Sequence, residues 1–253
     1  MPSMFVALLV ACAAAVAGAQ QPPPQIGIAP ATVGAGPFLF DTAEQHRLRV
    51  VVVARGLAHP FSLAFLPNGD ALVTERGARL RLVRHATGSE GGAPTLEAAP
   101  IAGIPQQPSF RTGALQEVLL HPQFTTNRLV YFTYNKAGEP GANPGQRQSA
   151  ITLARGRFDG AALTDVEELF VGDWNAGASG SRMAFGPGGF LYLTTGAPFG
   201  DQAQNAGTVY GKVLRLREDG TVPPDNPFTG RPGTRPEIFS LGHRDQLGMT
   251  VHE

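Results

Sequence analysis

The chain has 253 residues with 20 basic and 20 acidic side chains, so its net charge is zero. Its composition, 42% hydrophobic and 16% charged, is that of a globular protein with a sizeable core, and no basic stripe indicates nucleic-acid binding. The 32 glycines and 22 prolines are fewer than low-complexity disorder requires and indicate many tight turns.

An apolar segment opens the chain. Residues 1–19 are rich in Ala, Val and Leu and end in Ala17-Gly18-Ala19, which fits a signal-peptide cleavage site. The segment is too short for a comfortable membrane span. We therefore expect export with removal of residues 1–19, which gives a periplasmic or secreted protein without a transmembrane segment. Cys12 lies in a sequence that resembles a lipoprotein box, but it comes very early, and we favour soluble export over anchoring at Cys12.

A Pro/Gly-rich stretch follows the apolar segment. Residues 20–46 contain Pro22-Pro23-Pro24 and scattered glycines, a composition that predicts an extended leader. We expect the folded domain to occupy residues 47–253. Its first strand is predicted within residues 47–55, because this stretch is rich in β-branched side chains.

A hairpin motif recurs along the domain. Pro67, Pro122 and Pro187 each follow one apolar, strand-like run and precede another. After the third repeat the pattern is most complete, because four short apolar runs separated by turn residues predict one antiparallel blade. These predicted strands are residues 181–185, 190–195, 212–217 and 236–241. A further strand is expected at Met249–Val251.

Repeats of this length in an all-β chain predict a β-propeller of four-stranded antiparallel blades. A β-sandwich is the alternative, because it also has short strands at turn-rich intervals. The repeated proline favours the propeller. Three full repeats and the start of a fourth do not close a ring of roughly four to eight blades. We therefore expect a propeller that is truncated at its C-terminus, with about four blades present.

Several blocks of the sequence resemble the soluble glucose/sorbosone dehydrogenase family, the quinoprotein aldose sugar dehydrogenases. The blocks lie at residues 56–76, 113–124, 182–195, 211–215, 219–228 and 236–248, so the resemblance extends from about residue 50 to the end. It implies a six-bladed β-propeller that binds pyrroloquinoline quinone (PQQ) with calcium and oxidises an aldose at its anomeric carbon. The calcium site is expected beyond residue 253.

The same resemblance implies which positions would carry the chemistry, and this chain departs from the family at several of them. The family's catalytic histidine, in a His-x-Gly-Gly-Arg pattern, is replaced by Ala178, and its supporting aspartate is replaced by Ala197. The family's glutamine corresponds to Thr112 and its asparagine to Asp245, whereas Arg244 is retained. Arg244, Asp245 and Thr112 are therefore the expected cofactor-binding residues.

The candidate residues also have structural interpretations. Arg244 either faces the cofactor or forms an ion pair with Asp245 or another carboxylate. Oxidation needs a base for the hydroxyl proton, a role that suits histidine, and His243 is the remaining candidate. A histidine beside a strand end is more often a packed turn residue. Asp219 and Asp225 suggest calcium ligands by composition, but local turns explain them better.

Three functions stay open from the sequence alone. The first is a PQQ-dependent sugar dehydrogenase in which the usual base is lost. The second is a non-catalytic exported propeller that binds a carbohydrate or a protein partner, because a fold does not guarantee a chemistry. The third is a metal-dependent hydrolase of the lactonase type, which would need carboxylate and asparagine ligands that the blocks above do not show.

Overall fold

The computed structural model describes residues 33–88, 91–107, 114–138, 147–175, 179–197 and 200–252. The expected signal peptide, Cys12 and the first part of the expected leader lie outside these ranges. In the described part of the chain, none of the helices is long and apolar enough to cross a lipid bilayer. The chain divides into two compact units, residues 1–51 and 52–253.

The first unit, as far as it is described, contains one antiparallel hairpin. Strand β1 (Phe38–Phe40) pairs with β2 (Leu48–Val50). The Asp41 carboxylate accepts a hydrogen bond of 2.7 Å from the backbone N–H of Arg47, which helps to close the connection between the two strands. The strand expected within residues 47–55 is thus shorter than predicted, and part of the expected leader forms its partner.

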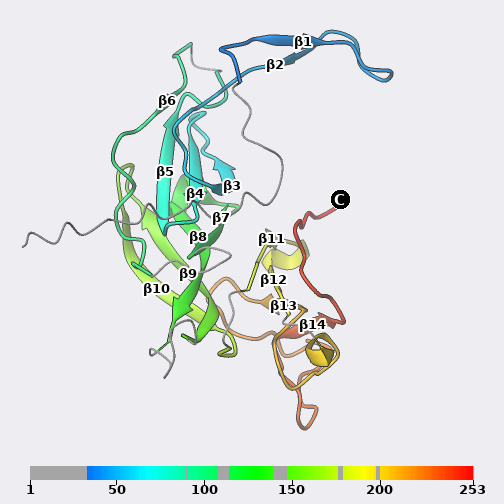
Figure 1. Cartoon of the computed structure of the whole chain (residues 1–253). Helices are drawn as coiled ribbons and strands as arrows, with labels where there is room; N and C mark the ends of the chain where they lie inside the picture. The colour runs from blue at the N-terminus through cyan, green and yellow to red at the C-terminus, as the bar shows by residue number, and fades with distance from the viewer. Residues whose placement is uncertain are drawn as a thin grey trace, which may run out of the picture. The chain divides into compact units, whose positions relative to one another are not determined.

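The second unit consists of three four-stranded antiparallel sheets, each with its strands in chain order (Figure 1). The first sheet contains β3 (Pro60–Phe65), β4 (Ala71–Glu75), β5 (Arg79–Arg84) and β6 (Thr95–Leu96). The second contains β7 (Leu115–Leu120), β8 (Leu129–Ala137), β9 (Ser149–Phe158) and β10 (Leu163–Val171), with the short helix α1 (Phe124–Asn127). The third contains β11 (Met183–Phe185), β12 (Leu191–Thr195), β13 (Lys212–Leu216) and β14 (Ile238–Leu241), with 3₁₀ turns at Pro187–Gly189 and Asp201–Ala203.

The repeated prolines mark equivalent places in the three sheets. Pro67, Pro122 and Pro187 all lie in the connection between the first and second strands of a sheet. In the first sheet the Asp70 carboxylate accepts a hydrogen bond of 2.9 Å from the backbone N–H of His85, which ties this connection to the end of β5. The sequence repeat is therefore a structural repeat.

The sheets pack face to face through two apolar layers. The layer between the first and second sheets includes Leu72, Leu80, Phe132 and Ala154. The layer between the second and third sheets includes Tyr131, Leu153, Leu193 and Leu214. Alternate side chains of a strand point to opposite faces, so Tyr131 and Phe132 of β8 enter different layers. The first strands also follow one another in space, because β7 contacts both β3 and β11.

Four-stranded sheets that stack face to face with adjacent first strands are the blades of a β-propeller. The predicted all-β propeller fold is therefore confirmed over the β-sandwich. The structure describes three blades, where about four were expected. Residues Met249–Val251, the expected start of the next blade, do not form a strand.

Candidate functional site

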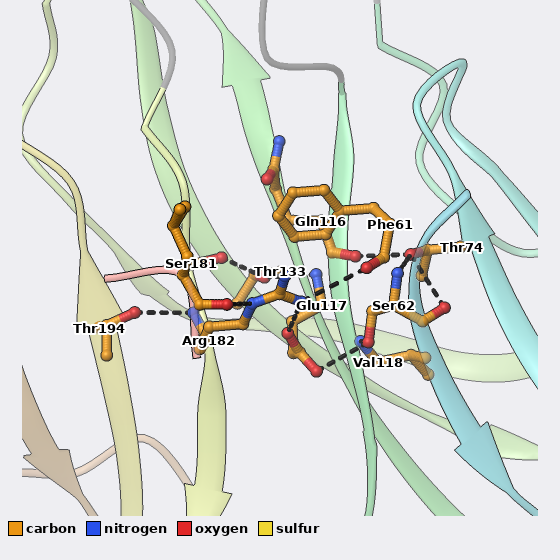
Figure 2. A network of polar contacts seen from close by, with 11 residues as sticks. Phe61, Ser62, Thr74, Gln116, Glu117, Val118, Thr133, Ser181, Arg182 and Thr194 are labelled. Atoms are coloured by element: carbon orange, nitrogen blue, oxygen red, sulfur yellow. Dashed lines mark hydrogen bonds and ion pairs between the residues drawn. The ribbon is translucent and has the colours of Figure 1, made fainter. Parts of the chain in front are cut away.

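Each blade has the same hydrogen bond between its first and second strands, which we call the polar device (Figure 2). A backbone N–H of the first-strand segment donates to a threonine hydroxyl of the second strand. The pairs are Ser62 N to Thr74 Oγ1 at 2.9 Å, Glu117 N to Thr133 Oγ1 at 3.1 Å, and Arg182 N to Thr194 Oγ1 at 2.7 Å. In β3 and β7 the device coincides with a register shift, an irregularity that changes the direction of side chains.

Two of these threonines also reach the next blade. The Thr74 hydroxyl donates to the carbonyl of Gln116 at 2.6 Å, and the hydroxyls of Thr133 and Ser181 lie 2.6 Å apart. All four residues are buried. A hydroxyl serves both purposes because it donates one hydrogen bond and accepts others. Hydrogen bonds therefore hold the first strands at a fixed spacing, in addition to apolar packing.

Charged side chains at the same level link the three blades. The Ser62 hydroxyl donates to Glu117 Oε1 at 2.7 Å, and Arg182 Nη1 donates to Glu117 Oε2 at 2.8 Å. Arg182 lies over the Phe61 ring, 4.2 Å from its centroid, and its Nε donates to the Leu247 carbonyl at 2.9 Å. The Glu117 and Arg182 side chains are only 13% and 21% exposed, which strengthens their attraction relative to a pair in bulk water.

The loop after β14, residues 242–248, crosses the end of the third blade at which β12 ends and β13 begins. Its backbone is bonded to the neighbouring loops. The His243 N–H donates to the Gly211 carbonyl at 3.0 Å, and the Ala197 N–H donates to the Arg244 carbonyl at 2.7 Å. These bonds hold the loop against the backbone that surrounds β12 and β13.

Two glycines allow this close approach. A Cβ atom on Gly211 would lie 2.0 Å from the His243 carbonyl oxygen, and the φ angle of 65° also favours glycine. A Cβ atom on Gly196 would lie 2.2 Å from Asp245 Oδ1. The loop therefore lies directly on bare backbone, and the Asp245 carboxylate fills the space beside Gly196.

A buried lysine closes the connection between β12 and β13. Lys212 is fully buried, and its ammonium group donates to the carbonyls of Gln202 and Ala203 at 3.0 Å each and of Tyr210 at 2.5 Å. Burial lowers the pKa of Lys212, although the negative charge of Asp173 acts in the opposite direction. Because three carbonyls use its three donors, Lys212 is a structural cation.

The residues predicted by resemblance meet only in part. Arg244 and Asp245 are exposed neighbours on the loop 242–248, and the Ala197 backbone is bonded to this loop. Thr112 and Ala178 lie outside the described residues. The structure therefore brings two of the three expected cofactor-binding residues to one loop, together with one of the two alanine replacements.

The remaining candidates make local contacts. His243 Nε2 lies 2.9 Å from the Ser240 hydroxyl, which agrees with a packed turn residue. Asp219 Oδ1 accepts two hydrogen bonds from Thr221, at 2.9 and 2.6 Å, and Asp225 pairs with an arginine of β13 at 2.7 Å. Among the described residues, no group of three or more His, Cys, Asp or Glu side chains is arranged to hold a metal ion. The contacts of Asp219 agree with the turn interpretation, whereas the contact of Asp225 is an ion pair with β13.

Sequence reasoning missed the polar device and the role of Glu117. A usable signal was present, because Thr74, Thr133 and Thr194 each end an apolar run in the second strand of a repeat. A buried threonine at an equivalent place in every repeat indicates a shared hydrogen bond. Glu117 has no such signal, because its partners lie on other blades.

Three blades with a glycine-supported polar loop define a β-propeller with a candidate ligand site at one end of its strands. Residues 57–253 match the family model described as "Glucose / Sorbosone dehydrogenase". Over 221 residues the chain is 38% identical to the uncharacterized protein slr1608 of Synechocystis sp., with coverage of 82% of this chain and 52% of the relative. Over 212 residues it is 32% identical to the aldose sugar dehydrogenase YliI of Escherichia coli, with coverage of 81% and 53%.

A solved structure gives the same result. The PQQ-bound form of the aldose sugar dehydrogenase from Streptomyces coelicolor matches with a TM-score of 0.59 and 30% identity, over 76% of this chain and 53% of that chain. This chain belongs to the glucose/sorbosone dehydrogenase family, as the resemblance predicted. It spans about half the length of the curated relatives that it matches.

Proposed function

We propose that this chain is part of an exported, PQQ-dependent sugar dehydrogenase-type protein that oxidises an aldose at its anomeric carbon. Family membership, the E. coli aldose sugar dehydrogenase and the PQQ-bound Streptomyces enzyme support this reaction class. The observation that carries the proposal is the loop 242–248, which lies on the bare backbone of Gly196 and Gly211 and exposes Arg244. The activity of the whole protein is a proposal, because the chain spans only about half of its relatives.

Among the described residues of this site, Arg244 is the one that suits an anionic cofactor. PQQ carries carboxylate groups, and a planar guanidinium binds a carboxylate through two parallel hydrogen bonds. Arg244 is the residue that we expect to hold the cofactor, with Asp245 and Thr112 as polar contacts. When bound, the quinone supplies the two-electron acceptor for the sugar. Calcium is proposed on the resemblance alone, and the described part of the chain supplies no cluster of ligands for it.

This site lacks the family's usual proton acceptor. Oxidation of an aldose requires a base that takes the hydroxyl proton, and loss of a positioned base typically slows a reaction by about 10²- to 10⁴-fold. Alanine at positions 178 and 197 cannot accept a proton, and the His243 ring is engaged with Ser240. We therefore propose that the protein binds the quinone but turns over slowly compared with a relative that has the histidine.

Reconstitution tests this proposal. The full-length protein of which we propose this chain is part is purified and mixed with PQQ and calcium. Quinone binding is followed by absorbance, and dye reduction is measured with glucose and other aldoses. We expect binding with slow turnover in the wild type and faster turnover in the variant Ala178→His/Ala197→Asp. Ala161→Asp, on an exposed turn of the second blade, controls for the added charge. Absence of quinone binding would contradict the proposal, and fast wild-type turnover would indicate another base, tested with His243→Ala.

A non-catalytic exported propeller that binds a carbohydrate or a protein partner is the second candidate. Ala197 favours it, because a methyl group stands at the edge of the loop where the family has a carboxylate. Titration calorimetry separates the two candidates. Binding of a sugar by protein that does not bind PQQ would support the second candidate over the first.

A further inference from the structure

We propose that Arg182, oriented by Glu117, is the positioning residue for the loop 242–248 and hence for Arg244 and Asp245. The proposal rests on the proposed function, because this loop carries the residues that we expect to hold the quinone. The two side chains belong to the first-strand segments of different blades, and Figure 2 shows them pointing toward each other.

The Arg182 guanidinium is held on three sides. It lies over the Phe61 ring at 4.2 Å from the centroid, Nη1 donates to Glu117 Oε2 at 2.8 Å, and Nε donates to the Leu247 carbonyl at 2.9 Å. The N–H groups of a guanidinium point in fixed directions within one plane. The bond to Glu117 therefore also fixes the direction in which Nε–H meets Leu247.

The contact with Leu247 gives the loop a second anchor. The first anchor is the pair of backbone bonds that join His243 to Gly211 and Ala197 to Arg244. Arg244 and Asp245 lie in sequence between His243 and Leu247, so the two anchors bracket them. Gln246 Nε2 adds a hydrogen bond of 3.2 Å to the Lys212 carbonyl of the same blade. Through Glu117, Arg182 ties the loop to the second blade, whereas the bonds to Gly211, Ala197 and Lys212 lie within the third blade.

Glu117 connects the second anchor to the other blades. Its Oε1 accepts a hydrogen bond of 2.7 Å from the Ser62 hydroxyl, and this hydroxyl oxygen accepts one of 3.3 Å from the Val118 N–H. The position of the Arg182 side chain is thus set by the first and second blades as well as the third. Hydrogen bonds that involve charged groups are stronger than neutral ones, so these contacts resist displacement.

Arg155 offers a closely matched control. Its Nε donates to Glu167 at 2.7 Å and its Nη1 to the Glu218 carbonyl of the third blade at 2.9 Å. Its side chain is 22% exposed, compared with 21% for Arg182. Both arginines therefore join a carboxylate to a carbonyl of the third blade. Glu218 follows the end of β13, which is the opposite end of the strands from the loop 242–248.

Amide hydrogen exchange of the purified chain without cofactor measures the positioning directly. Arg182→Lys keeps the charge but loses the planar fork, and we expect the Ala197 and His243 amides to exchange roughly 10- to 100-fold faster. Arg155→Lys should leave both amides unchanged. Glu117→Gln should increase the exchange rate of these amides as Arg182→Lys does. The double variant should exchange little faster than either single variant, because both substitutions remove the same contact. Unchanged exchange in Arg182→Lys, or equal increases in both lysine variants, would overturn the proposal.

Chemical rescue separates positioning from general stability. Methylguanidinium should restore protection of the loop amides in Arg182→Ala, because it can occupy the space between Glu117 and Leu247. The amides should stay protected in Arg155→Ala with or without methylguanidinium. Failure of methylguanidinium to restore protection in Arg182→Ala would contradict the positioning role of Arg182.

PQQ titration then tests the link to the proposed function. Arg182→Lys should weaken quinone binding and Arg155→Lys should not. Undiminished quinone affinity in an Arg182→Lys protein whose loop exchanges faster would refute the positioning of the quinone by this loop. If the wild type does not bind PQQ, the proposed function fails, and the exchange and rescue experiments still decide the positioning of the loop.

Discussion

Replacing Gly211 by alanine should destabilise the protein by about 3–4 kcal/mol and displace the loop 242–248. Two effects add at this position. An alanine at a φ of 65° costs roughly 1–2 kcal/mol in backbone strain. Its Cβ would also lie 2.0 Å from the His243 carbonyl oxygen, so the loop must move away.

Movement of the loop breaks two backbone hydrogen bonds. They are the bond from His243 to Gly211 at 3.0 Å and the bond from Ala197 to Arg244 at 2.7 Å, and each is worth about 1 kcal/mol. Gly230 provides the control, because its φ is 74° and a Cβ atom there would meet no other atom within 4 Å. Gly230→Ala should therefore cost only the strain, roughly 1–2 kcal/mol.

Thermal unfolding followed by circular dichroism measures this difference. A destabilisation of 1 kcal/mol lowers the Tm by about 2–4 °C in a protein of this size. Gly211→Ala should thus melt roughly 4–8 °C below Gly230→Ala. Equal melting temperatures for the two variants would refute the reasoning, because they would show that the loop does not lie against Gly211.

Three further predictions concern other parts of the chain. Burial alone would raise the pKa of Glu75, but a backbone hydrogen bond and two nearby arginines outweigh it and lower this pKa below its usual value. The folded-state pKa is depressed, so the stabilisation by Glu75 is present above its unfolded-state pKa and lost as the pH falls through the folded one. Glu75→Gln should therefore reduce the free energy of unfolding at neutral pH by roughly 3 kcal/mol and lower the Tm accordingly. The difference in Tm from the wild type should shrink below about pH 4.5. The His121 ring should carry its proton on Nε2. The Gln123 N–H and the Asn127 amide group donate to Nδ1 at 3.0 and 2.7 Å, and Nε2 lies 2.8 Å from the Glu218 carboxylate. A proton on Nδ1 in ring ¹⁵N spectra would contradict this. N-terminal sequencing of exported protein should find a start near Gln20, whereas a lipid-modified Cys12 would favour anchoring.

The predictable part of the fold is the part that depends on local sequence. The strands expected at 190–195 and 212–217 are found at Leu191–Thr195 and Lys212–Leu216, because turn residues bound each apolar run. The recurrence of Pro67, Pro122 and Pro187 indicated the repeat of the blades, because each proline marks the turn between the first two strands of a blade. The strand expected at Met249–Val251 is not found, because an apolar run becomes a strand only when another strand pairs with it.

The site was harder to predict because its residues act across blades. Arg244 and Asp245 are adjacent in sequence and could be placed on one loop, but what fixes that loop lies elsewhere. Arg182 lies 65 residues before Leu247 and 65 residues after Glu117. No local sequence pattern therefore indicates that these residues are in contact. In this chain the apolar repeat specifies each blade, and the contacts between blades include polar ones that differ from one repeat to the next. At equivalent places this chain has Ser62, Glu117 and Arg182, and it is the difference between these side chains that lets them bond to one another.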